Sequence, residues 1–193
     1  MSQKIGEVIE ASTSGFAAEC DELHRPPPFG SLVRTREGDI DIYAVVSHAT
    51  TASIEPGRRP IARGRGDIEE SDIYRANPQL EKLLRTEFEA LVIGHRDGGR
   101  FNHYLPPRPA RIHSFVYLCD SDDVAAFNDS FDYLSTLVSG NESSDDLVAA
   151  VLRNVASAHD SPRDFLVRAG KELATLLIND IARLNSILRK VRA

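Results

Sequence analysis

The sequence has few of the features that mark secreted, membrane or metal-binding proteins. Its 193 residues include only two cysteines, Cys20 and Cys119, which lie far apart and match no metal-ligand spacing. Both fall in strand-like contexts, so we expect free thiols in a reducing compartment. Residues 1–7 contain no apolar signal-peptide core, and no stretch approaches the ~20 apolar residues of a membrane span. These absences predict a soluble, cytoplasmic chain without membrane contact.

Composition and charge are those of an ordinary globular protein. Hydrophobic residues make up 41% of the chain and charged residues 27%. A chain of this length buries about 70% of the surface that it exposes when unfolded, so no disulfide or metal is needed to stabilise it. The net charge of −6 argues against nonspecific phosphate binding by the surface as a whole.

The chain changes character near Asp120. Nine of its ten prolines and ten of its twelve glycines precede this point and separate short apolar runs, whereas long helical periods follow it. Strands followed by helices are typical of an α+β protein. We therefore predict a small N-terminal β-barrel over residues 1–119 and a C-terminal helical subdomain of about three helices over residues 120–193.

Short extended segments fill the first part. The clearest is 39–48, where Ile40, Ile42, Ala44 and Val46 recur with a period of two and so point to one side. Six or so short strands with glycine and proline turns fit a closed barrel better than an open sheet, because closure removes exposed edges. The other strands are predicted at 4–10, 16–20, 31–35, 88–94, 101–105 and 112–119.

The region between the strands at 39–48 and 88–94 has a different pattern. Residues 50–71 show no apolar period and are predicted to form a long loop. Asn77 followed by Pro78 is a typical helix start. We therefore predict a short helix near 78–85.

Three helices are predicted in the second part. The first begins at position 120 or 121 and ends at Gly140, and the second begins at 143 or 144. Ser161 followed by Pro162 opens the third, whose apolar residues recur three or four apart over 162–192. At roughly 30 residues this helix is ~45 Å long, too long for one small barrel to cover. Part of its apolar face is therefore a candidate contact in a homo-oligomer.

Several short motifs in the first part resemble the HAS barrel. This small β-barrel lies at the N-terminus of HerA-type DNA-translocating ATPases and of the catalytic subunits of rotary ATP synthases. The resemblance implies a barrel that contacts other subunits and, as in HerA-type proteins, a partner nuclease. It covers about residues 4–118, and its matching segments are 5–9 with Ser12 and Thr13, 29–33, 42–46, 77–80, 92–95 and 105–109.

The ATPase domain that follows the barrel in HerA-type proteins has no counterpart among these residues. Its chemistry needs the motif G-x-x-x-x-G-K-[ST], which cradles phosphates and places a lysine and a Mg²⁺-binding hydroxyl. The only Gly-Lys pair, Gly170 and Lys171, is followed by Glu172, and Phe165 stands where the first glycine belongs. The resemblance therefore implies a barrel without its ATPase domain.

No set of residues predicts catalysis, a metal or a cofactor. The six histidines lack the spacing of a metal site, so we interpret them as structural or surface residues. Acidic clusters at 120–123 and 145–146 coincide with predicted helix starts, where capping and the helix dipole favour negative charge. Asp120 beside Cys119 is expected to raise the pKa of the thiol and to disfavour a nucleophilic thiolate. The sequence thus predicts a protein that is not an enzyme.

A glycine-bearing segment over 57–66 carries four arginines in eight positions. Arg58, Arg59, Arg63 and Arg65 have the planar fork that binds phosphates and carboxylates. Nucleic acid and an acidic protein partner are the two candidate ligands, but no aromatic residue between the arginines offers a stacking platform for single strands. The simpler interpretation is a solvated loop whose arginines pair with acidic residues just downstream, within 67–72.

The leading hypothesis is a non-catalytic interaction or adaptor module that binds a protein partner, either a HerA-type ATPase or a nuclease. The alternative, less favoured, is a nucleic-acid-binding accessory protein that uses the arginines of 58–65. A third hypothesis is a small enzyme whose site is assembled from residues distant in the sequence.

Overall fold

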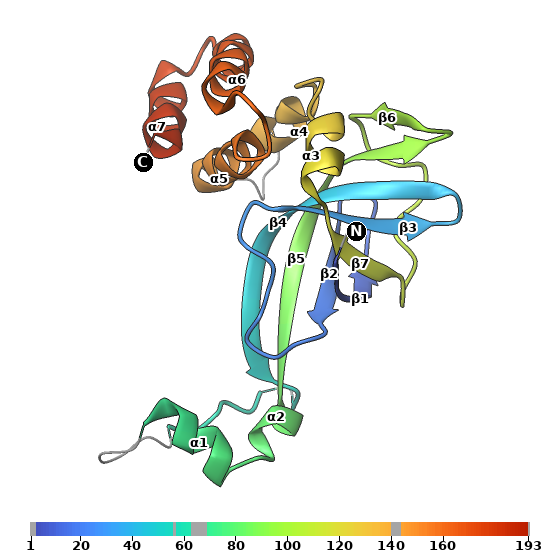
Figure 1. The fold of residues 1–193 in the computed structure, drawn as a ribbon, viewed down its shortest axis with the longest axis vertical. Coiled ribbons are helices and arrows are strands. Elements are labelled where there is room, and N and C mark those ends of the chain that lie inside the picture. The colour runs from blue at the N-terminus through green and yellow to red at the C-terminus, as the bar shows by residue number, and fades with distance from the viewer. Residues whose placement is uncertain (1–2, 56, 63–68, 140–143, 193) are drawn as a thin grey trace.

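The structure, a computed structural model, describes residues 3–55, 57–62, 69–139 and 144–192. Six strands form a closed antiparallel barrel in the order β2-β1-β7-β3-β4-β5, and β5 pairs with β2 to close it (Figure 1). A short seventh strand, β6, pairs with the end of β5. The predicted α+β fold, an N-terminal barrel followed by helices, is confirmed. The strands are β1 (Gln3–Ala11), β2 (Gly15–Cys20), β3 (Leu32–Glu37), β4 (Ile40–Ser53), β5 (Leu84–Asp97), β6 (Arg100–Asn102) and β7 (Phe115–Leu118).

The barrel interior confirms the alternation predicted for β4. Ile42, Ala44 and Val46 point inward and are fully buried, while Tyr43 and Val45 on the opposite face are buried as well. A strand buried on both faces belongs to two cores at once, which explains its nearly unbroken apolar run. The inner core consists of Val8, Phe16, Ala18, Val33, Ile42, Ala44, Val46, Phe88, Ala90, Val92, Ala110 and Val116.

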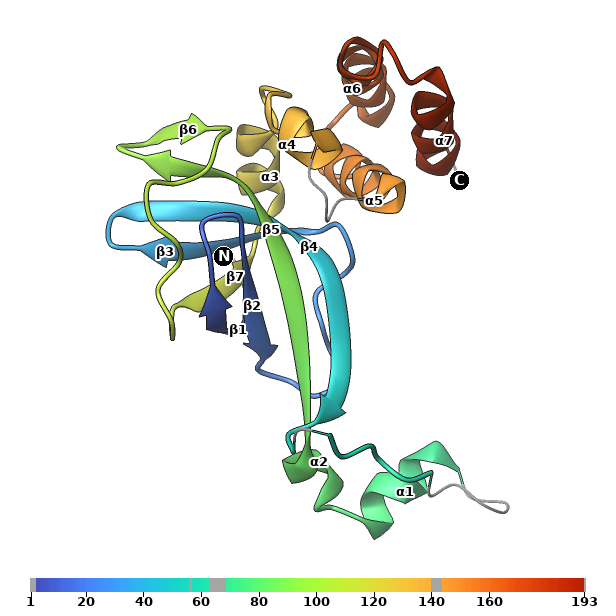
Figure 2. The same cartoon turned by 180° about the vertical axis from the view of Figure 1, so that it is seen from behind.

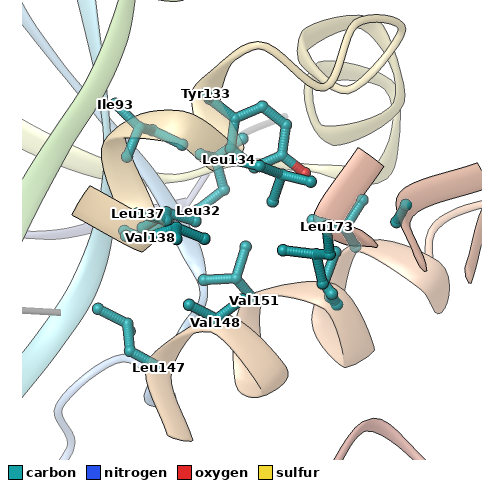
Figure 3. Packing of buried hydrophobic residues seen from close by; sticks show 14 of the residues in the cluster. Leu32, Ile93, Tyr133, Leu134, Leu137, Val138, Leu147, Val148, Val151 and Leu173 are labelled. Carbon is teal, nitrogen blue, oxygen red and sulfur yellow. The ribbon is translucent and has the colours of Figure 1, made fainter. Parts of the chain in front are cut away.

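A second core lies between the outer face of the barrel and the helices. Leu32 and Ile93 from the barrel meet Leu134, Leu137 and other helical residues there (Figure 3). The last barrel strand ends at Leu118, and the next helix begins at Ser121. Since the barrel wall and the helices share this core, the division into a barrel over residues 1–119 and a helical subdomain over 120–193 stays a prediction. The covering helices are α3 (Ser121–Phe127), α4 (Tyr133–Ser139), α5 (Asp145–Ala156), α6 (Pro162–Leu176) and α7 (Ile181–Val191).

In the part of the chain that the structure describes, five helices follow the barrel where about three were predicted. Two of the predicted helix starts are confirmed. The side chains of Asp120 and Ser144 accept hydrogen bonds from the backbone N–H groups three residues on, both at 3.1 Å. The first predicted helix is divided into α3 and α4, because Asn128 donates its side-chain amide to Val124 O at 2.7 Å and ends α3. The break lets both Phe127 and Tyr133 pack in the second core.

The long helix predicted over 162–192 was wrong. It is broken between α6 and α7, where the side chain of Asp180 caps α7 by accepting a hydrogen bond from Arg183 N at 3.0 Å. The chain then folds back on α5, burying Ile187 and pairing Arg183 Nε with Asp145 Oδ1 at 2.9 Å. Much of the apolar face assigned to a second subunit is therefore covered within the chain, and homo-oligomerisation stays a prediction. None of the described helices is long and apolar enough to cross a membrane.

The region 50–85 also differs from its prediction. β4 continues to Ser53, and α1 (Glu70–Ala76) occupies the end of the expected loop. Asn77 is the C-cap of α1 rather than a helix start, and α2 (Leu80–Leu83) begins after Gln79.

A cluster of ion pairs fixes the outer face of β3, β4 and β5 beside the second core. Asp41 on β4 is 5% exposed and receives hydrogen bonds from Arg36 Nε at 2.9 Å and from Arg96 Nη2 at 2.7 Å. Burial by itself would raise the pKa of Asp41, but the hydrogen bonds from Arg96 and Arg36 outweigh it and hold the pKa below its ordinary value. The charged form of Asp41 therefore stabilises the folded state.

Asp41→Asn is expected to lower the free energy of unfolding by about 1–2 kcal/mol near neutral pH, because two arginines lose their charged acceptor. The folded pKa is depressed, so this contribution is present above the unfolded pKa, about 3.9, and is lost as the pH falls through the folded pKa. Urea unfolding at a series of pH values should show that the difference in free energy of unfolding between Asp41→Asn and the parent becomes smaller below pH ~4. Asp39→Asn, at the neighbouring exposed turn position, is the control. A difference that is constant with pH would contradict the assignment.

Candidate interaction site

β4 and β5 run on beyond the barrel as a two-stranded ribbon that ends in α1 and α2 (Figures 1 and 2). We call residues 50–86 the arm. β2 pairs with β5 only from Glu87 to Leu91, so the strands of the arm pair with each other alone. No described residue of the arm belongs to either hydrophobic core. The arm lies at the opposite end of the molecule from α6 and α7.

The loop after β2 holds the base of the arm. His24 N donates to Thr86 Oγ1 at 2.8 Å, and Thr86 Oγ1 lies 2.8 Å from Thr51 Oγ1. The ring of His24 reaches α1, where its Nε2 lies 2.5 Å from the Tyr74 hydroxyl. His24 adopts a φ of 63°, a left-handed conformation that non-glycine residues rarely use. These contacts orient the arm relative to the barrel.

A cavity of about 260 Å³ opens near the tip of the arm. Its wall is mostly apolar, and its members come from three short pieces of chain around the strand ends. Ile61 is exposed, with 81% of its surface accessible. The lining residues are Ser53, Glu55, Arg58, Arg59, Pro60, Ile61, Ile73, Tyr74, Leu80, Leu83 and Leu84.

Two of the four predicted site arginines border this cavity. Arg58 pairs with Glu55 at 2.7 Å, and this hydrogen bond raises the pKa of the guanidinium. Arg59 is exposed and pairs with no acidic side chain in the described part of the chain. Arg63 and Arg65 lie outside the described residues. The expected pairing with downstream acids does not hold for Arg58, whose partner lies upstream.

The cavity combines apolar side chains with a few charged ones. Its one lining carboxylate, Glu55, is neutralised by Arg58. A pocket of this kind accepts an apolar side chain and offers the guanidinium of Arg59 to an acidic neighbour of that side chain.

Neither the two cysteines nor His95 and His103 line the arm's cavity. Burial, and to a smaller extent the negative charge of Asp21, raises the pKa of the Cys20 thiol to about 11. Burial, and to a smaller extent the negative charge of Asp123, raises the pKa of the Cys119 thiol. The rings of His95 and His103 contact the carbonyl oxygens of Tyr104 at 3.1 Å and Phe127 at 2.8 Å. Within the ranges that the structure describes, no three histidine, cysteine or acidic side chains gather as metal ligands.

Sequence reasoning selected Arg58 and Arg59 as candidates, which stay a prediction, and missed the apolar wall beside them. Ile73 and Tyr74 lie on α1, a helix of only seven residues that is too short to show a clear helical period. Ile61 lies in an arginine-rich segment without apolar periodicity, so the sequence did not mark it as a binding residue. No protein-family model matches the chain, and no curated protein matches it.

Proposed function

We propose that this chain is a non-catalytic protein-interaction module of the HAS-barrel type, which docks a protein partner through the arm. The partner class that the resemblance implies is a HerA-type ATPase or a nuclease. A closed six-stranded barrel at the N-terminus agrees with that resemblance, although other barrel families share such an architecture.

The observation that carries the proposal is the apolar cavity of the arm. Apolar residues normally stabilise a protein by leaving water for its core, yet Ile61 and the cavity wall stay outside both cores. Folding of the barrel therefore does not explain them, whereas binding does. Protein interfaces bury apolar anchors in such pockets and place arginine beside them.

Ile61→Glu is expected to weaken partner binding while leaving the fold intact, because the side chain is exposed in the free chain and would bury a charge in the complex. The tagged chain would be recovered from its native cells, copurifying proteins identified by mass spectrometry, and affinity for the purified partner measured by calorimetry. The dissociation constant should rise by a factor of about 10 or more.

Ile178→Glu is the matched control, since Ile178 is 70% exposed near α6 and α7 at the other end of the molecule. Equal recovery of an ATPase or nuclease with both variants would exclude the arm as its docking site, and recovery of the chain alone would count against the adaptor function. Nucleic acid recovered instead, and released by salt or by the joint change of Arg58 and Arg59 to Ala, would favour the nucleic-acid alternative.

A further inference from the structure

The barrel has a weak seam between β3 and β7. These strands pair over only two residue pairs, Val33 with Leu118 and Arg34 with Tyr117, whereas β3 pairs with β4 along its whole length. Beyond the seam the chain before β7 turns toward β1, where His113 N donates to Val8 O and Val8 N donates to Ser114 O, both at 2.9 Å. His113 has a φ of 69° at this turn.

The diverging strands leave a cleft of about 470 Å³ on the outside of the barrel. A cavity of this size accommodates a small organic molecule. None of its lining residues belongs to the arm, so the cleft is separate from the cavity there. The lining residues are Arg34, Thr35, Arg36, Glu37, Gly38, Asp41, Arg111, Ser114, Phe115 and Tyr117.

Three arginines and two acidic residues, Glu37 and Asp41, line this cleft in a chain whose net charge is −6. Arg34 and Arg36 are held in place by ion pairs, with Asp123 at 3.7 Å and with Asp41 at 2.9 Å. Arg111 is exposed and pairs with no acidic side chain among the residues that the structure describes. The cleft thus has two oriented guanidinium groups and one that is free to fork onto an anion.

Thr35 backs the cleft without offering it a binding group. Its strand neighbour Val33 and its cross-strand partner Ile42 both belong to the inner core. Because side chains alternate between the two faces of a strand, Thr35 points toward the barrel interior. Its Oγ1 is fully buried, so a ligand in the cleft does not reach this hydroxyl.

An apolar surface adjoins these polar groups. Phe115 on β7 is half-exposed, and Lys4 Nζ lies 4.2 Å from the centre of its ring. Tyr117, two residues along the same strand, also lines the cleft. The site therefore combines oxyanion-binding groups with an aromatic surface, which together match a small molecule that carries both a charged group and a ring.

We propose that the β3–β7 cleft binds a small organic oxyanion, whose charged group lies against Arg36 and Arg111 and whose ring lies against Phe115. A phosphate monoester and a carboxylate share this chemistry, so phenyl phosphate and benzoate are the two probes. The probe that binds more tightly identifies the charged group.

Titration of the ¹⁵N-labelled full chain with each probe tests the proposal by NMR. At least one probe should give saturable shifts confined to the amides of 34–37, 111 and 114–117. Arg111→Gln should weaken that binding by about tenfold, because a charge-assisted hydrogen bond is lost. Arg108→Gln changes the same charge in the same loop, at an exposed residue outside the cleft, and should leave the affinity unchanged.

Thr35→Val is a second control, at the wall of the cleft. The hydroxyl that it removes is buried away from the cleft, so the affinity for the probe should stay unchanged. Shifts that do not saturate with either probe, or that are equal in Arg111→Gln and Arg108→Gln, would overturn the proposal.

Discussion

Gly30→Ala is expected to destabilise the protein by about 3 kcal/mol or more. Gly30 has a φ of 76°, where an L side chain is strained by roughly 1–2 kcal/mol. A methyl group there would also lie 2.8 Å from Val151 N and 2.7 Å from the Cβ of Ala150, both on α5. Backbone atoms in a packed helix cannot move aside easily, so overpacking adds about 1–3 kcal/mol. Urea unfolding of the variant measures the sum.

Gly38→Ala is the matched control for this prediction. Gly38 lies in the turn between β3 and β4 with a φ of 58°, but a methyl group there would meet nothing within 4 Å. Its cost should be the conformational strain alone, about 1 kcal/mol. The difference between the two variants reports the close contact of the barrel with α5. An equal loss of free energy of unfolding in both variants would contradict the close contact between Gly30 and α5.

Phe127→Ala is expected to cost about 3–5 kcal/mol, the usual loss for a fully buried phenylalanine. Phe127 is completely buried at the end of α3 and stacks on Tyr43 of β4, with 5.0 Å between ring centres. Its ring also lies 4.7 Å from that of His103 and 5.7 Å from that of Tyr133. The substitution would leave a cavity where the barrel meets the helices. Near-ultraviolet circular dichroism should report loosened tyrosine packing along with the lower free energy of unfolding.

Phe29→Ala provides the comparison for Phe127→Ala. Phe29 is 44% exposed, so its removal should cost less than about 1 kcal/mol. If both variants lose the same free energy, the second core does not join the barrel to the helices as described. A biphasic unfolding curve for Phe127→Ala would instead show that the two parts unfold separately once their contact is weakened.

Local patterns predicted much of the fold. The alternation in 39–48 identified the inward residues of β4, and the polar residues Asp120 and Ser144 identified two helix starts. Each of these signals depends on neighbours within four residues, because strand alternation and capping are local hydrogen-bonding and side-chain geometry. Such local signals can therefore be recognised from the sequence alone.

The errors arose where distant contacts outweighed local pattern. The apolar period over 162–192 is continuous in sequence, but α7 folds back because Arg183 reaches Asp145 and Ile187 finds a buried place against α5. In the same way, the arm continues as a ribbon because 14-residue strands β4 and β5 pair along nearly their full length. Pairing between strands is a tertiary choice that single-segment propensity does not determine.

By itself, the sequence determined the barrel-then-helices order, the inward face of β4 and the positions of Arg58 and Arg59. Only the tertiary structure decided that Ile61 and Ile73 border one cavity with those arginines, and that Arg36 and Arg111 line one cleft. The physical reason is closure: residues tens of positions apart become neighbours only when β7 and β3 complete the barrel and when β4 and β5 pair to form the arm.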